Sequence, residues 1–266
     1  MSEVYTHGHH ESVLRSHTWR TAENSAAYLL PELAPGLALL DVGCGPGTIT
    51  ADLAARVAPG RVVGLDRSEE PLDQARQSAA QRGLTNVSYV VGDVYALDFP
   101  DATFDVVHAH QVLQHLVDPV AALREMARVT RPGGVIAVRD ADFAAMSWHP
   151  QSPGLTRWRE VYQAVARGNG AEPDAGRVLL AWAHRAGFTE VTPSAGVWCY
   201  ATPADRAWWS GLWADRITQS ALADQAVDSG AADREELAQL ADAWRAWGEE
   251  PDGWFAVLHG ELIIHR

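Results

Sequence analysis

Short apolar runs alternate with amphipathic stretches between residues 37 and 142. The apolar runs are rich in β-branched residues, which is typical of strands buried on both faces of a sheet. They cover residues 37–43, 61–66, 87–93, 104–111 and 135–142. Residues 48–58, 69–83 and 119–130 lie between them and have helical periodicity. This alternation predicts right-handed βαβ units, an open and mostly parallel sheet, and therefore a doubly wound α/β fold.

The pattern after residue 142 is less regular. Residues 143–170 predict a loop and a helix, residues 173–188 a helix, and residues 189–200 a strand. Residues 203–248 predict helices, and residues 254–266 a closing strand. Near the N-terminus, Thr21 is expected to cap a helix that runs to about Leu33.

Charge and cysteine content narrow the class of protein. The 266 residues include 34 acidic and 21 basic side chains, so the net charge is −13, and every basic residue is arginine. Without lysine, the chain has no Schiff-base chemistry and no phosphate-binding P-loop. The acidic balance also argues against nucleic acid as a partner. The chain has two cysteines, no apolar run of about 20 residues and no signal-like N-terminus. These features predict a cytoplasmic protein without a membrane span.

A glycine-rich turn joins the first predicted strand to the first predicted helix. The stretch LLDVGCGPGTIT places Gly43, Gly45 and Gly47 directly behind the strand. Glycine at this point permits a tight turn and lets the backbone approach a ligand at the carboxyl edge of a sheet. A dinucleotide fingerprint requires glycine or alanine at position 48, where this chain has Thr48. A nicotinamide-dependent oxidoreductase is therefore the less favoured alternative.

Polar residues follow the next predicted strands. Asp66 ends the second strand, 19 residues beyond Gly47, where a carboxylate can accept hydrogen bonds from ribose hydroxyls. Asp93 ends the third strand, and polar residues end the fourth, at His108–Gln111. Four successive strand ends thus present groups that suit an adenosine without requiring phosphates.

Four stretches of the chain together resemble the successive motifs of class I S-adenosylmethionine-dependent methyltransferases. They are LLDVGCGPGTIT, VVGLD, VVGDVYALDFPDATFDVVHAHQVLQHLVDP and REMARVTRPGGVIAV. The likeness is greatest to the ubiquinone/menaquinone-biosynthesis type and its small-molecule relatives, and it covers roughly residues 37–140. It implies a seven-stranded sheet whose last strand is antiparallel. Arg131 departs from relatives that often carry lysine there. The region after Asp142 has no specific match, which leaves the substrate open.

The resemblance implies S-adenosyl-L-methionine as the cofactor and assigns positions to its parts. Gly43 and Gly45 would face the methionine moiety, with Asp41 supporting the loop, and the main-chain carbonyl of His110 would meet the ammonium group. The ribose and the adenine would contact four further residues, which are Asp66, Arg67, Asp93 and Val94. Helix capping or loop solvation is the competing explanation for the two aspartates. Arg20 is a further hypothesis for the methionine carboxylate.

On this basis the chain divides into three segments of one domain. Residues 1–36 would form an N-terminal helical cover, residues 37–142 the cofactor-binding core, and residues 143–266 the rest of the sheet. Helical cover insertions are expected at residues 143–170 and 203–248. Ten of the 11 tryptophans fall between Trp148 and Trp254, either as core residues or as the lining of an aromatic substrate pocket. Candidates for that lining are Trp148, Trp158, Trp208, Trp209 and Trp213.

A general base would help only if the acceptor is a hydroxyl or a carbon acid. Candidate bases are His115, Asp140 and His149, with His110 and Asp142 also near the expected edge. A packed histidine and a capping carboxylate are the competing explanations. The histidine cluster HGHH near the N-terminus lacks regular ligand geometry, so no metal site is predicted.

The leading hypothesis is in-line methyl transfer to a small apolar or aromatic metabolite. An RNA or protein methyltransferase and a non-catalytic adenosyl-binding protein are the alternatives, because binding motifs do not prove chemistry. The sequence leaves open the acceptor atom and the oligomeric state, and a homodimer is compatible with it.

Overall fold

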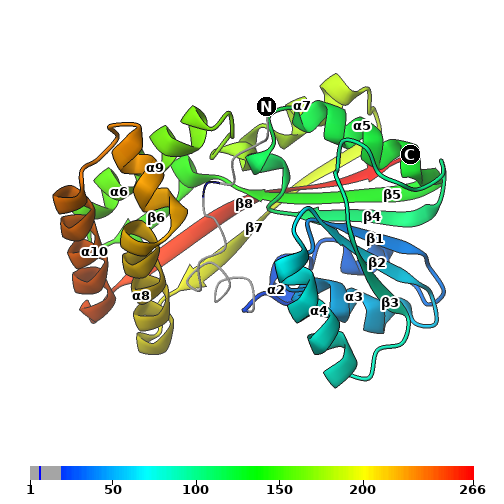
Figure 1. The fold of residues 1–266 in the computed structure, drawn as a ribbon, viewed down its shortest axis with the longest axis horizontal. Coiled ribbons are helices and arrows are strands. Elements are labelled where there is room, and N and C mark those ends of the chain that lie inside the picture. The colour runs from blue at the N-terminus through cyan, green and yellow to red at the C-terminus, as the bar shows by residue number, and fades with distance from the viewer. Residues whose placement is uncertain (1–5, 7–18) are drawn as a thin grey trace.

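The computed structural model describes residue 6 and residues 19–266 of the chain. The histidines considered above for a metal site lie outside these residues, at His7, His9, His10 and His17, as do residues 1–5 and 7–18 of the proposed N-terminal cover. Eight strands in the described part form one sheet in the order β3-β2-β1-β4-β5-β8-β6, and β7 pairs with the other side of β8 (Figure 1).

The strands have the following bounds: β1 Leu39–Val42, β2 Val62–Asp66, β3 Val87–Val91, β4 Phe104–His110, β5 Thr130–Ala141, β6 Ser147–His149, β7 Val191–Tyr200 and β8 Trp254–His265. The first five are parallel to one another, and β8 is antiparallel to β5, β6 and β7. The predicted doubly wound α/β fold with an antiparallel closing strand is confirmed.

Helices cover both faces of the sheet. One face carries α2 Ala22–Ser25, α3 Thr48–Val57 and α4 Glu69–Gln81, and the other carries α5 Pro119–Val129 and α7 Leu179–Ala186. The alternation of side chains along each strand explains this division. Leu39 and Val106 pack with α2 and α3, whereas Leu40 and Val107 pack with α5 and α7.

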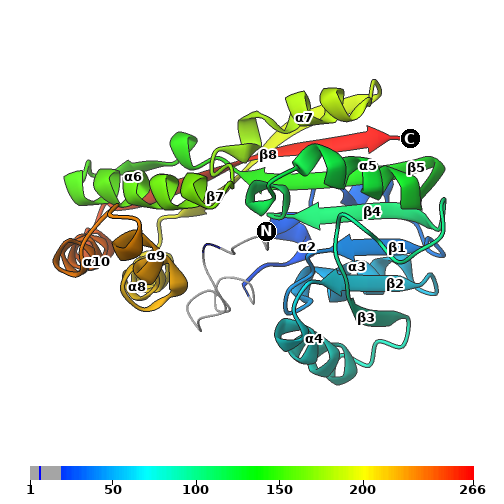
Figure 2. The same cartoon turned by 45° about the horizontal axis from the view of Figure 1, so that its top comes forward.

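Four further helices lie beyond the carboxyl ends of the parallel strands, and we call them the helical layer. They are α6 Pro153–Gly168, α8 Pro203–Gln219, α9 Ala221–Asp228 and α10 Arg234–Glu249. Figures 1 and 2 show that β1, β2 and β4 point toward this layer. Its core is aromatic, because Trp158 is fully buried and meets Trp213 and Trp244 edge to face at centroid distances of 4.5 and 4.8 Å.

Two local features differ from the sequence-based expectation. The helix capped by Thr21 ends at Ser25, and a short 3-10 helix at Leu30–Glu32 follows. Pro31 lies inside the predicted span and has no N–H with which to continue an α-helix. The eighth strand, β6, was not predicted, and it pairs with the start of β8 beyond the reach of β5.

The aromatic residues of the helical layer are mostly core residues. Trp148 and Trp209 are 6% and 4% exposed and pack in the same apolar cluster as Trp158. Trp208 is only partly buried. No described helix is both long enough and apolar enough to cross a membrane.

Candidate functional site

The glycine-rich turn between β1 and α3 has the backbone that its sequence predicts. Gly43, Gly45 and Gly47 have φ values of +67°, +54° and +74°, in the left-handed region that favours glycine. A Cβ on Gly47 would lie 2.7 Å from the Cβ of Ala75, and one on Gly43 would overlap the side chain of Val112. The turn is therefore closed to side chains at Gly43 and Gly47.

Asp41 supports this turn through contacts with two buried side chains. Its carboxylate lies 2.7 Å from Nδ1 of His108 on β4 and accepts a 2.5 Å hydrogen bond from the Thr50 hydroxyl on α3. All three side chains are buried. Asp41 thus ties β1 to a neighbouring strand and to the helix that follows the turn.

Asp66 braces the same turn from the end of β2. Its Oδ2 accepts a 3.0 Å hydrogen bond from the Gly45 N–H, and its Oδ1 accepts a 3.1 Å bond from the Ser68 N–H. A carboxylate has about four acceptor positions, so one aspartate can brace a turn and accept from other donors at the same time. The neighbouring Arg67 is exposed.

The predicted adenine-reading residues lie just past β3. Asp93 is exposed and accepts a 2.9 Å hydrogen bond from the Tyr95 N–H, whereas Val94 is buried. The sheet register pairs Asp66 with Val91. The register also pairs the last residue of β1 with both neighbouring strands near their ends. The sheet therefore brings the predicted residues of β1 to β4 to one edge.

His110, the last residue of β4, is buried at this edge. Both of its ring nitrogens lack a hydrogen-bond partner within the described chain. Burial lowers the pKa of His110 well below its usual value, and the nearby charges of Arg20 and Arg139 lower it further. The side chain is therefore neutral at physiological pH and sits in a region of positive potential.

A hydrogen-bonded chain that sequence reasoning missed lies next to His110. Arg20 donates a 2.7 Å hydrogen bond to Oε1 of Gln111, and Nε2 of Gln111 lies 2.8 Å from Nε2 of His259 on β8. Nδ1 of His259 lies 3.1 Å from the carbonyl oxygen of Val257, which can only accept. His259 therefore carries its proton on Nδ1 and accepts from Gln111, consistent with the lowering of its pKa by burial.

Asp140, a candidate base, faces away from His110. It follows Arg139 on β5, and successive strand residues point to opposite faces. Its Oδ1 accepts a 3.1 Å hydrogen bond from the Gln114 N–H, and its buried Oδ2 has no partner among the described residues. Burial raises the pKa of Asp140 to about 8. The carboxyl is therefore largely protonated at neutral pH and is a poor base there.

His115, the second candidate, is held by Gln114. The side-chain oxygen Oε1 of Gln114 accepts a 3.0 Å hydrogen bond from the Ala141 N–H. The side-chain nitrogen Nε2 of Gln114 therefore faces Nε2 of His115, at 3.0 Å. This nitrogen can only donate, which makes Nε2 of His115 the acceptor. Burial lowers the pKa of His115 to about 3. The contact with Gln114 thus occupies the lone pair that a general base would need.

The two remaining candidates do not reach the site in a form suited to catalysis. His149 is exposed on β6 and pairs with Trp254, five residues along β8 from His259. At about 3.4 Å per residue, this separation is roughly 17 Å. Asp142 is bound through both oxygens to Arg177 at 2.6 and 2.7 Å and caps the following turn. The structure therefore gives His149 no role at the carboxyl edge.

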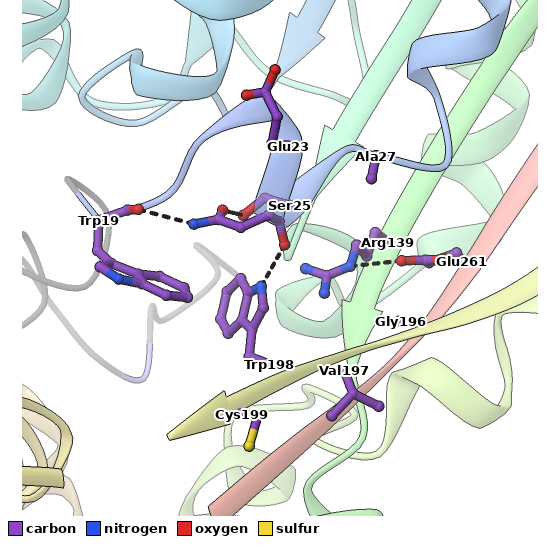
Figure 3. Close-up of a pocket in the computed structure, with 11 residues that line it drawn as sticks. Trp19, Glu23, Ser25, Ala27, Arg139, Gly196, Val197, Trp198, Cys199 and Glu261 are labelled. Carbon is purple, nitrogen blue, oxygen red and sulfur yellow. Dashed lines mark hydrogen bonds and ion pairs between the residues drawn. The ribbon is translucent and has the colours of Figure 1, made fainter. Parts of the chain in front are cut away.

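A cavity of about 330 Å³ opens beside this edge, between the segment around α2 and strands β5, β7 and β8 (Figure 3). Trp19, Arg139, Trp198 and Glu261 are among its lining residues. The ring of Trp19 contacts the rings of Trp198 and Trp208 at centroid distances of 5.3 and 5.6 Å. The site therefore combines an aromatic wall with a buried ion pair.

Within the described residues, no group of three or more histidine, cysteine or acidic side chains is arranged to hold a metal ion. Arg139 and Glu261 were missed by sequence reasoning, although each is a charged residue next to an apolar run within its strand. Such an interruption is the signal that could have identified them.

The chain is similar to known proteins over all or part of its length. The family described as "Methyltransferase domain" matches residues 33–189. An uncharacterized methyltransferase of Schizosaccharomyces pombe is 36% identical over 98% of this chain and 96% of its own length. A demethylmenaquinone methyltransferase of Listeria monocytogenes is 35% identical over 52% of this chain and 55% of its own length. The crystal structure of a SAM-dependent methyltransferase from Aquifex aeolicus superimposes with a TM-score of 0.50 and 23% identity, covering 64% of this chain and 83% of that one.

Proposed function

The chain belongs to the class I S-adenosylmethionine-dependent methyltransferases, and we propose that it methylates a small apolar or aromatic metabolite. The single observation that carries the proposal is the cavity with an aromatic wall beside the ends of β4 and β5. Its volume of about 330 Å³ is that of a site for one small molecule.

The residues at the carboxyl edge fit the cofactor. When bound, S-adenosylmethionine supplies a methyl group on a sulfonium, which is a good leaving group. We assign the backbone of Gly43 and Gly45 to the methionine moiety, because this turn excludes side chains. Asp66 would accept hydrogen bonds from the ribose while it braces the turn. The carbonyl of His110 would accept from the ammonium group.

Arg67, Asp93 and Val94 would enclose the adenine. Buried Val94 offers an apolar surface and a backbone N–H, and exposed Asp93 offers an acceptor for an exocyclic amine. Arg67, which is exposed beside the end of β2, would flank the adenine.

The chain's own contribution to the reaction is alignment and exclusion of water. Trp19 and Trp198 form an aromatic wall, and aromatic faces also attract a cationic methyl donor. The helical layer lies across the open edge of the sheet, so we propose that it encloses the acceptor as a cover. Of its tryptophans, Trp208 is placed for this role, because it contacts Trp19.

We also propose that the protein acts in the cytoplasm on an acceptor that is not a nucleic acid. Cys44 and Cys199 are free thiols, which suits a reducing compartment. A net charge of −13 opposes the binding of a polyanion.

The test is methyl transfer from labelled cofactor to a panel of phenols, quinols and hydroxybenzoates, with RNA and protein substrates alongside. We expect turnover in the small-molecule arm, and Trp19→Ala should raise KM for the acceptor at least tenfold while the Kd for S-adenosylhomocysteine changes less than twofold. Trp254→Ala is the matched control, because Trp254 is 41% exposed and does not line the cavity. Turnover confined to RNA or protein would refute the proposal, as would an equal effect of both substitutions.

A further inference from the structure

Arg139 is a charged residue buried in the middle of the sheet. It is only 2% exposed, and its Nε donates a 3.0 Å hydrogen bond to Oε1 of Glu261. Oε2 of Glu261 accepts a 2.9 Å bond from the Ser194 hydroxyl. Nη1 of Arg139 has no hydrogen-bond partner in the part of the chain described. One edge of the guanidinium is thus paired, and the other carries an unused buried donor.

Arg139 is also part of the wall of the cavity. Arg139 lines the cavity, and Figure 3 shows its guanidinium between Trp198 and Glu261. The guanidinium carbon lies 4.9 Å from the ring centre of Trp198. A Cβ on Gly196 would overlap Oε1 of Glu261 and lie 3.5 Å from Nη2 of Arg139. Strand β7 therefore makes room for the ion pair with a glycine.

The charges around the cavity favour an anion. Its two acidic lining residues are each paired with an arginine, Glu23 with Arg56 at 2.9 Å and Glu261 with Arg139. The guanidinium of Arg20 approaches from the α2 side, 5.6 Å from the Trp198 ring centre. Arg139 itself is only 2% exposed, and a charge in such a buried position acts over a longer range than one at the surface.

The cavity also lies close to the expected methyl donor. The sheet register pairs Arg139 with His110, the residue assigned to the methionine end of the cofactor. Adjacent strands are about 4.8 Å apart, so the two residues are direct neighbours. A molecule held by Arg139 would therefore lie one strand away from the residue assigned to the cofactor's ammonium group.

We propose that Arg139 binds an acidic oxygen of the methyl acceptor, a carboxylate or an ionised phenol, with the acceptor's ring against Trp198. A guanidinium matches such groups because it is planar, permanently charged and able to donate two parallel hydrogen bonds. This inference rests on the proposed function and narrows the acceptor to aromatic acids and acidic phenols.

The test compares benzoate with its neutral analogue benzamide, by calorimetry on protein saturated with S-adenosylhomocysteine. We expect benzoate to bind at least tenfold more tightly than benzamide, and Arg139→Gln to abolish the difference. Arg159→Gln is the matched control, because Arg159 also lies over a tryptophan ring, at 5.0 Å from Trp148, but outside the cavity. Equal binding of the two probes, or no binding of benzoate, would overturn the proposal.

Arg139→Gln leaves Glu261 buried without its partner, which destabilises the fold. Two further variants therefore distinguish a loss of folding from a loss of recognition. The double variant Arg139→Gln/Glu261→Gln removes both charges, and Gly196→Ala keeps both while filling space beside them. Each should lose the preference for benzoate and retain the Kd for S-adenosylhomocysteine within twofold. A tenfold rise in that Kd would instead assign Arg139 to the cofactor's carboxylate and overturn the proposal.

A second probe separates the two sources of the acidic oxygen. If the site takes phenols, bound 4-nitrophenol should show its phenolate absorption band at a lower pH than the free compound. If the site takes only carboxylates, benzoate alone should show the expected preference. These are binding measurements, so they remain interpretable even if no acceptor in the turnover panel is methylated.

Discussion

Replacing Asp140 with asparagine should change how the stability of the protein depends on pH. Asparagine has nearly the same shape, and its side-chain oxygen can keep the hydrogen bond that Asp140 accepts from the Gln114 N–H. It cannot ionise. The difference between the two proteins therefore isolates the cost of charging a buried carboxyl whose second oxygen has no partner among the described residues.

The magnitude follows from the pKa of Asp140, which burial raises from 3.8 to about 8. Between these two values the folded chain keeps a proton that the unfolded chain has released. The free energy of unfolding therefore falls as the pH rises, by about 1.4 kcal/mol per pH unit, and levels off above the folded pKa. From pH 6 to pH 8, wild type should lose about 2 kcal/mol relative to Asp140→Asn.

The measurement is urea unfolding of both proteins at pH 6, 7 and 8. The buried histidines, whose pKa values are lowered, titrate alike in both proteins and cancel in the difference. Asp98→Asn, at an exposed carboxyl, is the control and should follow wild type within about 0.5 kcal/mol. Parallel pH profiles for wild type and Asp140→Asn would refute the reasoning, since they would mean that Asp140 is ionised throughout.

Two further predictions concern the turn and the cofactor. Gly47→Ala should lower the free energy of unfolding by about 2–4 kcal/mol in urea unfolding, because the strain of its φ of +74° adds to contact with Ala75. Gly83→Ala, with a φ of +68° and open space around it, should cost only about 1–2 kcal/mol, and equal losses would contradict the packing argument. Asp66→Ala should weaken binding of S-adenosylhomocysteine by about 1–3 kcal/mol in calorimetry, and an unchanged Kd would assign Asp66 to the turn alone.

The sheet was predictable because its strands carry a strong local signal. The strand β1 is mostly apolar, and the glycine-rich turn follows it directly, so both could be placed without tertiary information. The strand β6 has only three residues, too few to show a period, and it forms because β8 extends beyond β5. The helix α2 ends at Ser25, six residues before Pro31, and nothing in the local sequence marks that point.

The predicted cofactor residues lie together for the same reason, since each follows a strand of a parallel sheet. The acceptor side could not be assembled in this way. Arg139 and Glu261 are 122 positions apart in the sequence, and only the antiparallel register of β5 and β8 brings them together. Nor does an aromatic side chain reveal from sequence alone whether it faces a core or a cavity. Trp148 proved to be a core residue, whereas Trp19 lines the cavity.

The long strand β8 has a mechanical consequence. One end pairs with β5 in the cofactor-binding core, the other pairs with β6 beside the helical layer, and β7 runs along it for ten positions. The two-stranded ribbon of β7 and β8 therefore connects the parallel part of the sheet to the helical layer. A hinge rotation of the helical layer would have to bend this ribbon and distort the hydrogen bonds between its strands. We therefore expect the helical layer to keep its position relative to the parallel strands, so that a change of acceptor would come from new side chains rather than from a rotation of this layer.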